Sequence, residues 1–292
     1  MTKSKLNKRY GKKIAFIIKV IVMVFFIMLF IRLFIFSTYS IHTESMYPTL
    51  IDGDQLLVNK FIHGPRFLFG TCDKKEAKRI RGIGSIKRND IIVFNFPFRK
   101  GNTRIDIDYN NFYVKRCIGL PGDAVCIDNG FYKTNGTSTI YGNYFNQYLL
   151  STISRKDLLN FCRDIETFPY DSFCCNWSIY NWGPLYVPKK ACAIKLDHKN
   201  IEFYKSIINY ETGRYITLKG NKVYLGSSEI GSYCFRDDYY FVGGDNVFNS
   251  YDSRYWGLLP EKAIVGVATH ILRSTDPITN KYREERFLKA LE

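Results

Sequence analysis

The 292-residue chain lacks the signatures of common metal and nucleotide sites. Its eight cysteines form no C-x-x-C pair, and no histidine lies at ligand spacing, which argues against a zinc site. No glycine-rich phosphate loop follows a strand-like segment, and no G-x-S-x-G motif is present. We therefore expect neither a metal nor another cofactor.

Positive charge is absent between Arg32 and Lys60, whereas residues 1–13 carry six Lys and Arg and no acid. The apolar run 14–36 is interrupted only by Lys19 and Arg32. Twenty-three helical residues rise roughly 35 Å, enough to cross a hydrocarbon core of about 30 Å. The charge asymmetry predicts a single-pass anchor in the cytoplasmic membrane, with residues 1–13 as a cytoplasmic tail and everything after residue 36 outside.

A cleaved signal peptide is the alternative to this anchor, because the uninterrupted apolar stretch 20–31 is only twelve residues long. The segment that follows the apolar run contains no A-x-A cleavage site, and Thr38-Tyr39-Ser40 is a poor substitute. We favour the uncleaved anchor.

The formal net charge of +15 suits a nucleic-acid binder or a protein at an anionic membrane surface. An exported domain leaves little access to nucleic acid, so we expect the lipid bilayer and its anionic headgroups as the partner. Residues 60–104 hold twelve Lys and Arg against three acids. For this stretch a solvated face is favoured over a headgroup-binding patch.

The exported part is predicted to be mainly β. Segments 52–61, 90–96, 110–120, 123–127, 239–246 and 263–272 are β-branched or aromatic and bounded by turn residues. No helices separate consecutive strands, which favours an antiparallel sheet or barrel. Residues 37–127 and 233–292 would form this β domain, and the aromatic-rich segment 128–232 would form an inserted α+β subdomain.

Two short helices are expected in the insertion, one after Ser154 and one between Asp197 and Gly213. In an exported domain some of its cysteines could form disulfides. The candidates are Cys162, Cys174, Cys175 and Cys192, with free buried thiols as the alternative.

Lys115 is the most informative basic residue. In the strand-like segment "YVKRCIGLPGD" a period of two places Tyr113 and Cys117 on its face. Desolvation lowers the pKa of a lysine, and a fall from ~10.4 to ~8 raises its neutral fraction at pH 7 roughly 200-fold. A neutral lysine can deprotonate a serine hydroxyl. The alternative is a lysine paired with Asp106 or Asp108.

Four motifs occur in order behind the apolar run. They are "SMYPTL" (45–50), "NDIIVFNFP" (89–97), "KRCIGLPGD" (115–123) and "GDNVFNSYDSRYWGLLP" (244–260). With this order and anchor the chain resembles the bacterial type I signal peptidases, membrane-anchored serine peptidases of family S26 that use a Ser–Lys dyad. The resemblance covers roughly 37–127 and 233–273, and the insertion matches only loosely.

The resemblance implies specific roles. Ser45 matches the nucleophile, Lys115 the general base, Thr43 an oxyanion-hole hydroxyl and Ser250 the serine that orients the lysine amine. Structural support falls on Asp245, Asn246, Asp252 and Arg254, of which the last two match an ion pair. The substrate pocket falls on Ile41, Met46, Leu50, Tyr113 and Val114.

Three positions depart from the family pattern without removing a catalytic group. Val247-Phe248 replaces a charged pair, Asn89 stands where Gly usually precedes Asp90, and His42 replaces a frequent Pro. They concern loop conformation and substrate preference.

The expected function is removal of signal peptides from exported preproteins with small residues one and three positions before the bond. One alternative is a specialised processing peptidase of the same family, for one exported substrate such as a conjugation or pilin protein. The other is a non-catalytic membrane-anchored scaffold.

Overall fold

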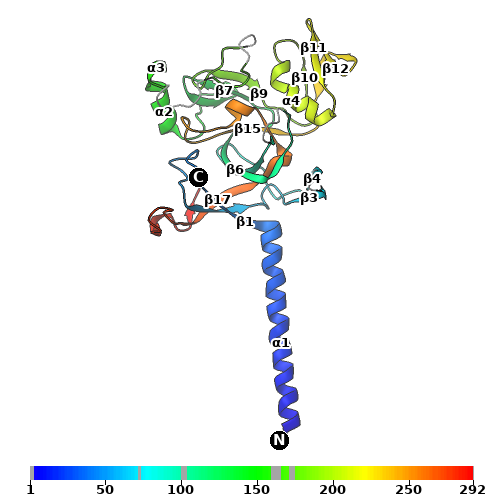
Figure 1. Ribbon diagram of the computed structural model, residues 1–292, viewed down its shortest axis with the longest axis vertical. Helices are drawn as coiled ribbons and strands as arrows, with labels where there is room; N and C mark the ends of the chain where they lie inside the picture. Colours follow the sequence, from blue (N-terminus) through cyan, green and yellow to red (C-terminus); the bar gives the residue numbers. More distant parts are fainter. Residues whose placement is uncertain (1–2, 72–73, 100–103, 159–165, 171–174, 292) are drawn as a thin grey trace.

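The computed structural model describes residues 3–71, 74–99, 104–158, 166–170 and 175–291. An N-terminal helix, α1 (Lys3–Phe30), continues into a five-residue π-helical turn, η1 (Ile31–Ile35). This rod projects away from the rest of the molecule (Figure 1). Its span long and apolar enough to cross a membrane is Lys13–Ile35, close to the predicted 14–36, and none of it is buried in the protein. The helix starts within the basic segment, so this segment extends the rod.

The end of the rod is attached to the domain. Lys60 Nζ donates hydrogen bonds to the carbonyls of Arg32 at 2.6 Å and Leu33 at 2.7 Å. A lysine is well suited to these positions, because the last carbonyls of a helix lack intrahelical partners. The rings of Phe34 and Phe67 also pack at 5.4 Å. The anchor therefore meets the domain at a fixed joint.

The main sheet has eight strands. They are β1 (Phe36–Ser40), β2 (Asp54–Asn59), β5 (Ile91–Phe96), β6 (Asp108–Gly119), β15 (Tyr239–Gly243), β16 (Leu259–Pro260), β17 (Ile264–Ser274) and β18 (Lys289–Ala290). Their order is β1-β2-β17-β5-β6-β15-β16, with β18 beside β17. Every pairing is antiparallel, which confirms the predicted mainly β fold.

Smaller sheets surround the main one. They are the hairpin β3 (Arg66–Thr71) and β4 (Lys74–Arg79), the triplet β7 (Ala124–Asp128), β8 (Phe131–Thr134) and β9 (Trp182–Tyr186), the pair β10 (Ala193–Lys195) and β14 (Ser232–Cys234), and the triplet β11 (Ile216–Lys219), β12 (Lys222–Leu225) and β13 (Ser228–Ile230). The short helices are α2 (Tyr144–Thr152), α3 (Arg155–Leu158), α4 (Ile201–Thr212), α5 (Ser253–Trp256), η2 (Glu261–Ala263) and η3 (Glu284–Arg286). In Figure 1 the hairpin lies at the anchor end and β11–β12 at the far end.

The helix predictions for the insertion were partly right. Helix α4 ends at Gly213 as expected, but its N-cap is Asn200 rather than Asp197. The cap at Ser154 is present, with its hydroxyl 3.2 Å from Asp157 N, although residues 159–165 lie outside the described ones. Helix α2 was not predicted. Among the disulfide candidates Cys192 carries a free thiol, and Cys162 and Cys174 lie outside the described residues.

One hydrophobic core runs through the main sheet and the insertion. Trp182 of β9, 1% exposed, packs its ring 4.9 Å from that of Phe241 in β15. Tyr132 of β8 contacts the same phenylalanine, at 6.3 Å between ring centroids. Because large buried aromatic side chains connect the two parts, we infer that segment 128–232 does not form an independent folding unit.

The core predicts cooperative unfolding. Trp182→Ala should lower the free energy of unfolding of the full-length protein by about 3–5 kcal/mol, since it removes a large side chain from a packed core. Near-UV circular dichroism and tyrosine fluorescence should then report one shifted denaturation curve. Separate transitions of the insertion and the sheet would contradict a shared core.

Candidate active site

Ser45 lies in the loop between β1 and β2. The loop forms a tight turn, because Tyr47 N donates to Glu44 O at 3.0 Å and Leu50 N donates to Met46 O at 2.9 Å. Ser45 itself is half-buried. The turn therefore presents the hydroxyl at the surface of the domain.

Lys115 lies on β6, opposite Ile92 of β5, and is 3% exposed. Its Nζ is 2.6 Å from Ser45 Oγ, although 70 residues separate the two in sequence. Its second contact is Val114 O at 3.2 Å. The predicted nucleophile and base are thus within hydrogen-bond distance.

The alternative acid partners of Lys115 are engaged elsewhere. Asp106 pairs with Arg99 at 3.2 Å, and Asp108 accepts a hydrogen bond from Asn111 Nδ2 at 2.6 Å. The structural lysine–aspartate pair that the sequence left open does not form.

Burial lowers the pKa of Lys115 from 10.5 to about 8. Asp252 and Asp245 act against this shift, whereas the positive charge of Arg254 adds to it. A pKa of about 8 leaves roughly a tenth of the amines neutral at pH 7, so the group can accept a proton at physiological pH.

Thr43 and Ser250 lie close to the pair in different ways. Thr43 Oγ1 is 3.5 Å from Ser45 Oγ. The Ser250 hydroxyl is buried and, in the described structure, forms no hydrogen bond with Lys115. It lies instead beside Asp252, where it helps to lower the pKa of that carboxyl. The role that the resemblance gives to Ser250 therefore has no direct contact to support it.

Gly244 fits tightly between the two loops. A Cβ at this position would lie 2.1 Å from Ser250 Oγ and 2.5 Å from Ser45 O, both closer than any real Cβ contact. This motif position is a glycine because the loop that carries Ser45 and the turn that carries Ser250 meet there.

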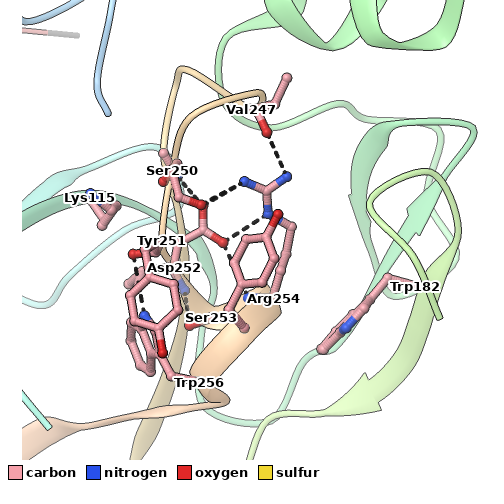
Figure 2. Close-up of polar contacts among 12 residues, drawn as sticks. Lys115, Trp182, Val247, Ser250, Tyr251, Asp252, Ser253, Arg254 and Trp256 are labelled. Atoms are coloured by element: carbon pink, nitrogen blue, oxygen red, sulfur yellow. Dashed lines mark hydrogen bonds and ion pairs between the residues drawn. The ribbon is translucent and has the colours of Figure 1, made fainter. Parts of the chain in front are cut away.

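Asp252 and Arg254 form a fully buried bidentate pair, with contacts of 2.8 and 2.9 Å. Burial is the largest influence and would raise the pKa of Asp252, but the Arg254 charge and the hydrogen bonds to the carboxylate together lower it. Arg254 also donates to Val247 O at 3.0 Å. In the view of Figure 2, Lys115 and Arg254 lie on opposite sides of the segment that carries Ser250 and Asp252. The Asp252–Arg254 pair therefore fixes the Ser250 turn on the side away from Lys115.

Asp245 has a partner that the sequence analysis missed. Arg116, next to Lys115 on β6, donates two hydrogen bonds to its carboxylate at 2.8 and 2.7 Å, and Thr49 adds a third at 2.5 Å. Asn246 donates from its backbone to Ser45 O and from its side chain to Glu44 O, each at 3.1 Å. The signal for the pair was a basic residue beside Lys115 and an acid within the last motif.

A pocket of about 540 Å³ adjoins the Ser45–Lys115 pair. Four of the five predicted pocket residues line it, namely Ile41, Met46, Tyr113 and Val114. Leu50 does not. It is 0% exposed and packs in the hydrophobic cluster beneath the loop, because the turn after Ser45 directs it into the core.

One edge of β6 is open beside this pocket. β15 pairs with β6 only at Arg116, Cys117 and Gly119, so among the described strands none pairs with Phe112–Lys115 on that side. β1, which leads to the Ser45 loop, is an end strand of the sheet. An extended peptide could therefore form main-chain hydrogen bonds along β6.

Asn89 explains one departure from the family pattern. Its φ of 72° is in the left-handed region, which glycine and asparagine adopt most readily. Its carbonyl accepts from Arg116 at 2.7 Å, and its side chain accepts from Gly142 N at 2.8 Å. Asparagine thus keeps the backbone conformation and adds a contact to the insertion.

Comparisons with known proteins identify the family and the relatives of this chain. Residues 14–272 match the family model described as "Signal peptidase, peptidase S26". Signal peptidase I of Buchnera aphidicola subsp. Schizaphis graminum is 33% identical over 85% of this chain and 71% of its own length. Signal peptidase I of Haemophilus influenzae is 28% identical over 88% and 70%. Signal peptidase I P of Bacillus subtilis subsp. natto is 28% identical over 93% and 95%.

The lowered pKa predicts a pH-dependent stability difference. Between about pH 8 and 10.5 the unfolded chain binds more protons than the folded one, so the free energy of unfolding of the wild type rises with pH. Below about pH 8 the whole destabilisation caused by burying the Lys115 amine is present. Lys115→Met should therefore unfold with a free energy about 3 kcal/mol higher at pH 7, a gain that disappears above pH 10.5. Denaturant titrations at pH 7 and above pH 10.5 measure the difference in the free energy of unfolding between the variant and the wild type. Lys195→Met, at an exposed lysine, is the control, and a pH-independent difference for Lys115→Met would argue against the lowered pKa.

Proposed function

Because the chain belongs to the signal peptidase family, peptidase S26, we propose that its catalytic pair is Ser45 and Lys115. The protein is a serine peptidase that removes signal peptides from preproteins, and its N-terminal apolar helix fits a membrane anchor. The observation that carries the assignment of the pair is the 2.6 Å contact between Lys115 Nζ and Ser45 Oγ.

The reaction begins with proton transfer. Neutral Lys115 takes the proton of Ser45 Oγ as the oxygen attacks the carbonyl carbon of the scissile bond. The oxyanion is stabilised by Ser45 N–H and the Thr43 hydroxyl. Protonated Lys115 then gives its proton to the leaving amine, and the acyl group stays on Ser45. Lys115 next deprotonates a water molecule, which attacks the ester; the C–O bond to Ser45 breaks, the signal peptide leaves as a carboxylic acid, and Lys115 returns the proton to Ser45 Oγ.

The open edge of β6 supports a binding mode for the substrate. We propose that the residues before the bond add as an extended strand beside Phe112–Lys115. Side chains one and three positions before the bond would then face the pocket of Ile41, Met46, Tyr113 and Val114. The bulk of these apolar residues favours small substrate side chains.

The two alternatives make different demands on the site. A scaffold has no use for a buried lysine whose pKa is lowered to about 8 beside a serine, and the cost of burying this amine argues against a scaffold. A specialised peptidase would keep the same dyad and cleave one exported substrate. Mapping the cut sites in several preproteins incubated with the purified protein separates broad from specialised processing.

The base assignment predicts the effects of two substitutions. Ser45→Ala should abolish cleavage in a protein that still folds. Lys115→Arg should be as inactive as Lys115→Ala, because arginine stays protonated. The wild-type single-turnover rate should rise with pH through about 8, since protonated Lys115 cannot act as a base. These rates on a purified preprotein are the measurement.

In the same assay Thr43→Ala should be less impaired than the Ser45 and Lys115 variants. The single-turnover cleavage rate of this variant should fall about 10²–10³-fold if the Thr43 hydroxyl supplies one oxyanion donor. An active Lys115→Arg enzyme, or a rate that rises near pH 6.5 as for a histidine base, would end the Ser–Lys mechanism.

We propose that the N-terminus is cytoplasmic and the catalytic domain lies outside the cytoplasmic membrane. The support is the charge difference across the anchor, six Lys and Arg before it and none between Arg32 and Lys60. A C-terminal alkaline phosphatase fusion should be active in cells, and a β-galactosidase fusion silent. The reverse pattern would refute this orientation.

Anionic lipid headgroups are the proposed membrane partner, and nucleic acid is not expected. Beside the anchor joint lie exposed apolar residues at Phe61, Leu68, Ile80 and Ile83, with exposed Arg81 among them. This mixture suits the interface of an anionic bilayer. Brominated phosphatidylglycerol should quench a tryptophan introduced by Ile83→Trp more than one introduced by Leu218→Trp in β11. Equal quenching would favour the solvated face.

A further inference from the structure

Helix α2 of the insertion reaches the two loops that carry the catalytic groups. Its residue Asn146 is 8% exposed and points inward. The side-chain amide donates one hydrogen bond to Tyr47 O at 3.0 Å and another to Asp245 O at 2.7 Å. Tyr47 follows Ser45 by two residues, and Asp245 belongs to the loop after Gly244. One amide group thus joins the nucleophile loop, which carries Ser45 and Tyr47, to the Asp245 loop.

Both acceptors have further links to the dyad. The Asp245 carboxylate is held by Arg116, the neighbour of Lys115 on β6. The next residue, Asn246, donates its backbone N–H to Ser45 O at 3.1 Å. A continuous set of hydrogen bonds therefore connects the strand of the base, the Asp245 loop, Asn146 and the nucleophile loop.

The helix itself is fixed at its N-terminal end. Asn143 caps it, with its side chain accepting from Asn146 N at 3.0 Å. Gly142 N donates to Asn89 Oδ1 at 2.8 Å, and Asn89 O in turn accepts from Arg116. Asn146 therefore acts from a rigid support that is itself tied to β6.

On the basis of the proposed function, we propose that Asn146 is a positioning residue for peptide-bond hydrolysis. It keeps the nucleophile loop and the Asp245 loop at a fixed separation, so that Ser45 Oγ stays within hydrogen-bond distance of Lys115. Asparagine is suited to this task because its amide nitrogen carries two N–H donors for two carbonyls. An aspartate would place oxygens against both carbonyls, and a leucine of similar size would leave both carbonyls without this partner. The insertion thereby contributes directly to catalysis.

Asn146→Leu should lower kcat roughly 10–100-fold, as expected when a reacting group is misplaced by up to about 1 Å. KM should change less than about threefold, because Asn146 does not line the substrate pocket. The kcat of the variant should still rise with pH through about 8, since Asn146 does not touch Lys115. Cleavage of a purified preprotein by the full-length protein in detergent micelles gives all three values.

Gln147→Leu is the matched control on the same helix. Gln147 is 0% exposed and also makes two hydrogen bonds, accepting from Tyr132 N at 2.8 Å and donating to Tyr141 O at 2.7 Å. Both hydrogen bonds lie within the insertion, and neither ends on the Ser45 loop or the Asp245 loop, whereas the ring of Tyr132 packs over Arg254 at 5.8 Å. This variant should lower the unfolding midpoint at least as much as Asn146→Leu while its kcat stays within about threefold of wild type.

Asn146→Ser, which keeps one donor, is the second variant if the leucine variant does not fold, and it should lose kcat to an intermediate degree. A folded Asn146→Leu or Asn146→Ser enzyme with wild-type kcat would overturn the proposal, and so would a Gln147→Leu enzyme that loses as much kcat as the Asn146 variants. An active Ser45→Ala enzyme would instead overturn the proposed function. An inactive Ser45→Ala enzyme with fully active Asn146 variants would refute only the positioning role.

Discussion

The site depends on one constraint, that a lysine amine stays buried beside a serine hydroxyl and gives up its proton more readily than an exposed lysine. Burial alone would favour this state, but a carboxylate within bonding distance would restore the ammonium form. Two buried carboxylates lie near Lys115, and each is already paired with an arginine, Asp252 with Arg254 and Asp245 with Arg116. Their influence on the lysine is opposed by burial and by Arg254. The ion pairs thus fix the surrounding loops while leaving the amine available as a base.

This arrangement explains why the last motif carries Asp245, Asp252, Arg254 and Gly244. Asp245 and Asp252 each accept two hydrogen bonds from an arginine, so the chain between them is held at both ends. Gly244 lets the backbone approach Ser45 O and Ser250 Oγ more closely than a side chain would permit. A buried pair of this kind is weak evidence for stability, because desolvation offsets much of the attraction. Its value here lies in fixing the geometry of the loop between the two aspartates.

The strands and the contact between Ser45 and Lys115 could be predicted because their signals are local or carried by motifs. Runs of β-branched and aromatic residues bounded by turn residues predicted each long strand of the main sheet, and Lys115 is buried in its strand as expected. Leu50 was misplaced because sequence spacing does not show that the turn after Ser45 directs it into the core. Helix α2 was missed because its inward face carries Asn146 and Gln147, which read as solvent-facing polar residues. Their burial follows from backbone acceptors that tertiary structure brings near, and no local pattern records those acceptors.

The end of the anchor is connected to Ser45 through paired strands. Lys60 follows β2 directly and donates to the last carbonyls of the membrane helix, so the sheet and the helix end share a joint. From that joint β1 runs for five residues, paired along its whole length with β2, and Ser45 lies five residues further. Ten residues span at most about 33–36 Å, and the turn at Ser45 shortens this reach. The hydroxyl is therefore held close to the end of the anchor by paired strands rather than by a flexible tether. In the proposed orientation, a substrate whose apolar segment lies beside the anchor would reach Ser45 with at most about ten extended residues, which favours bonds near the membrane surface.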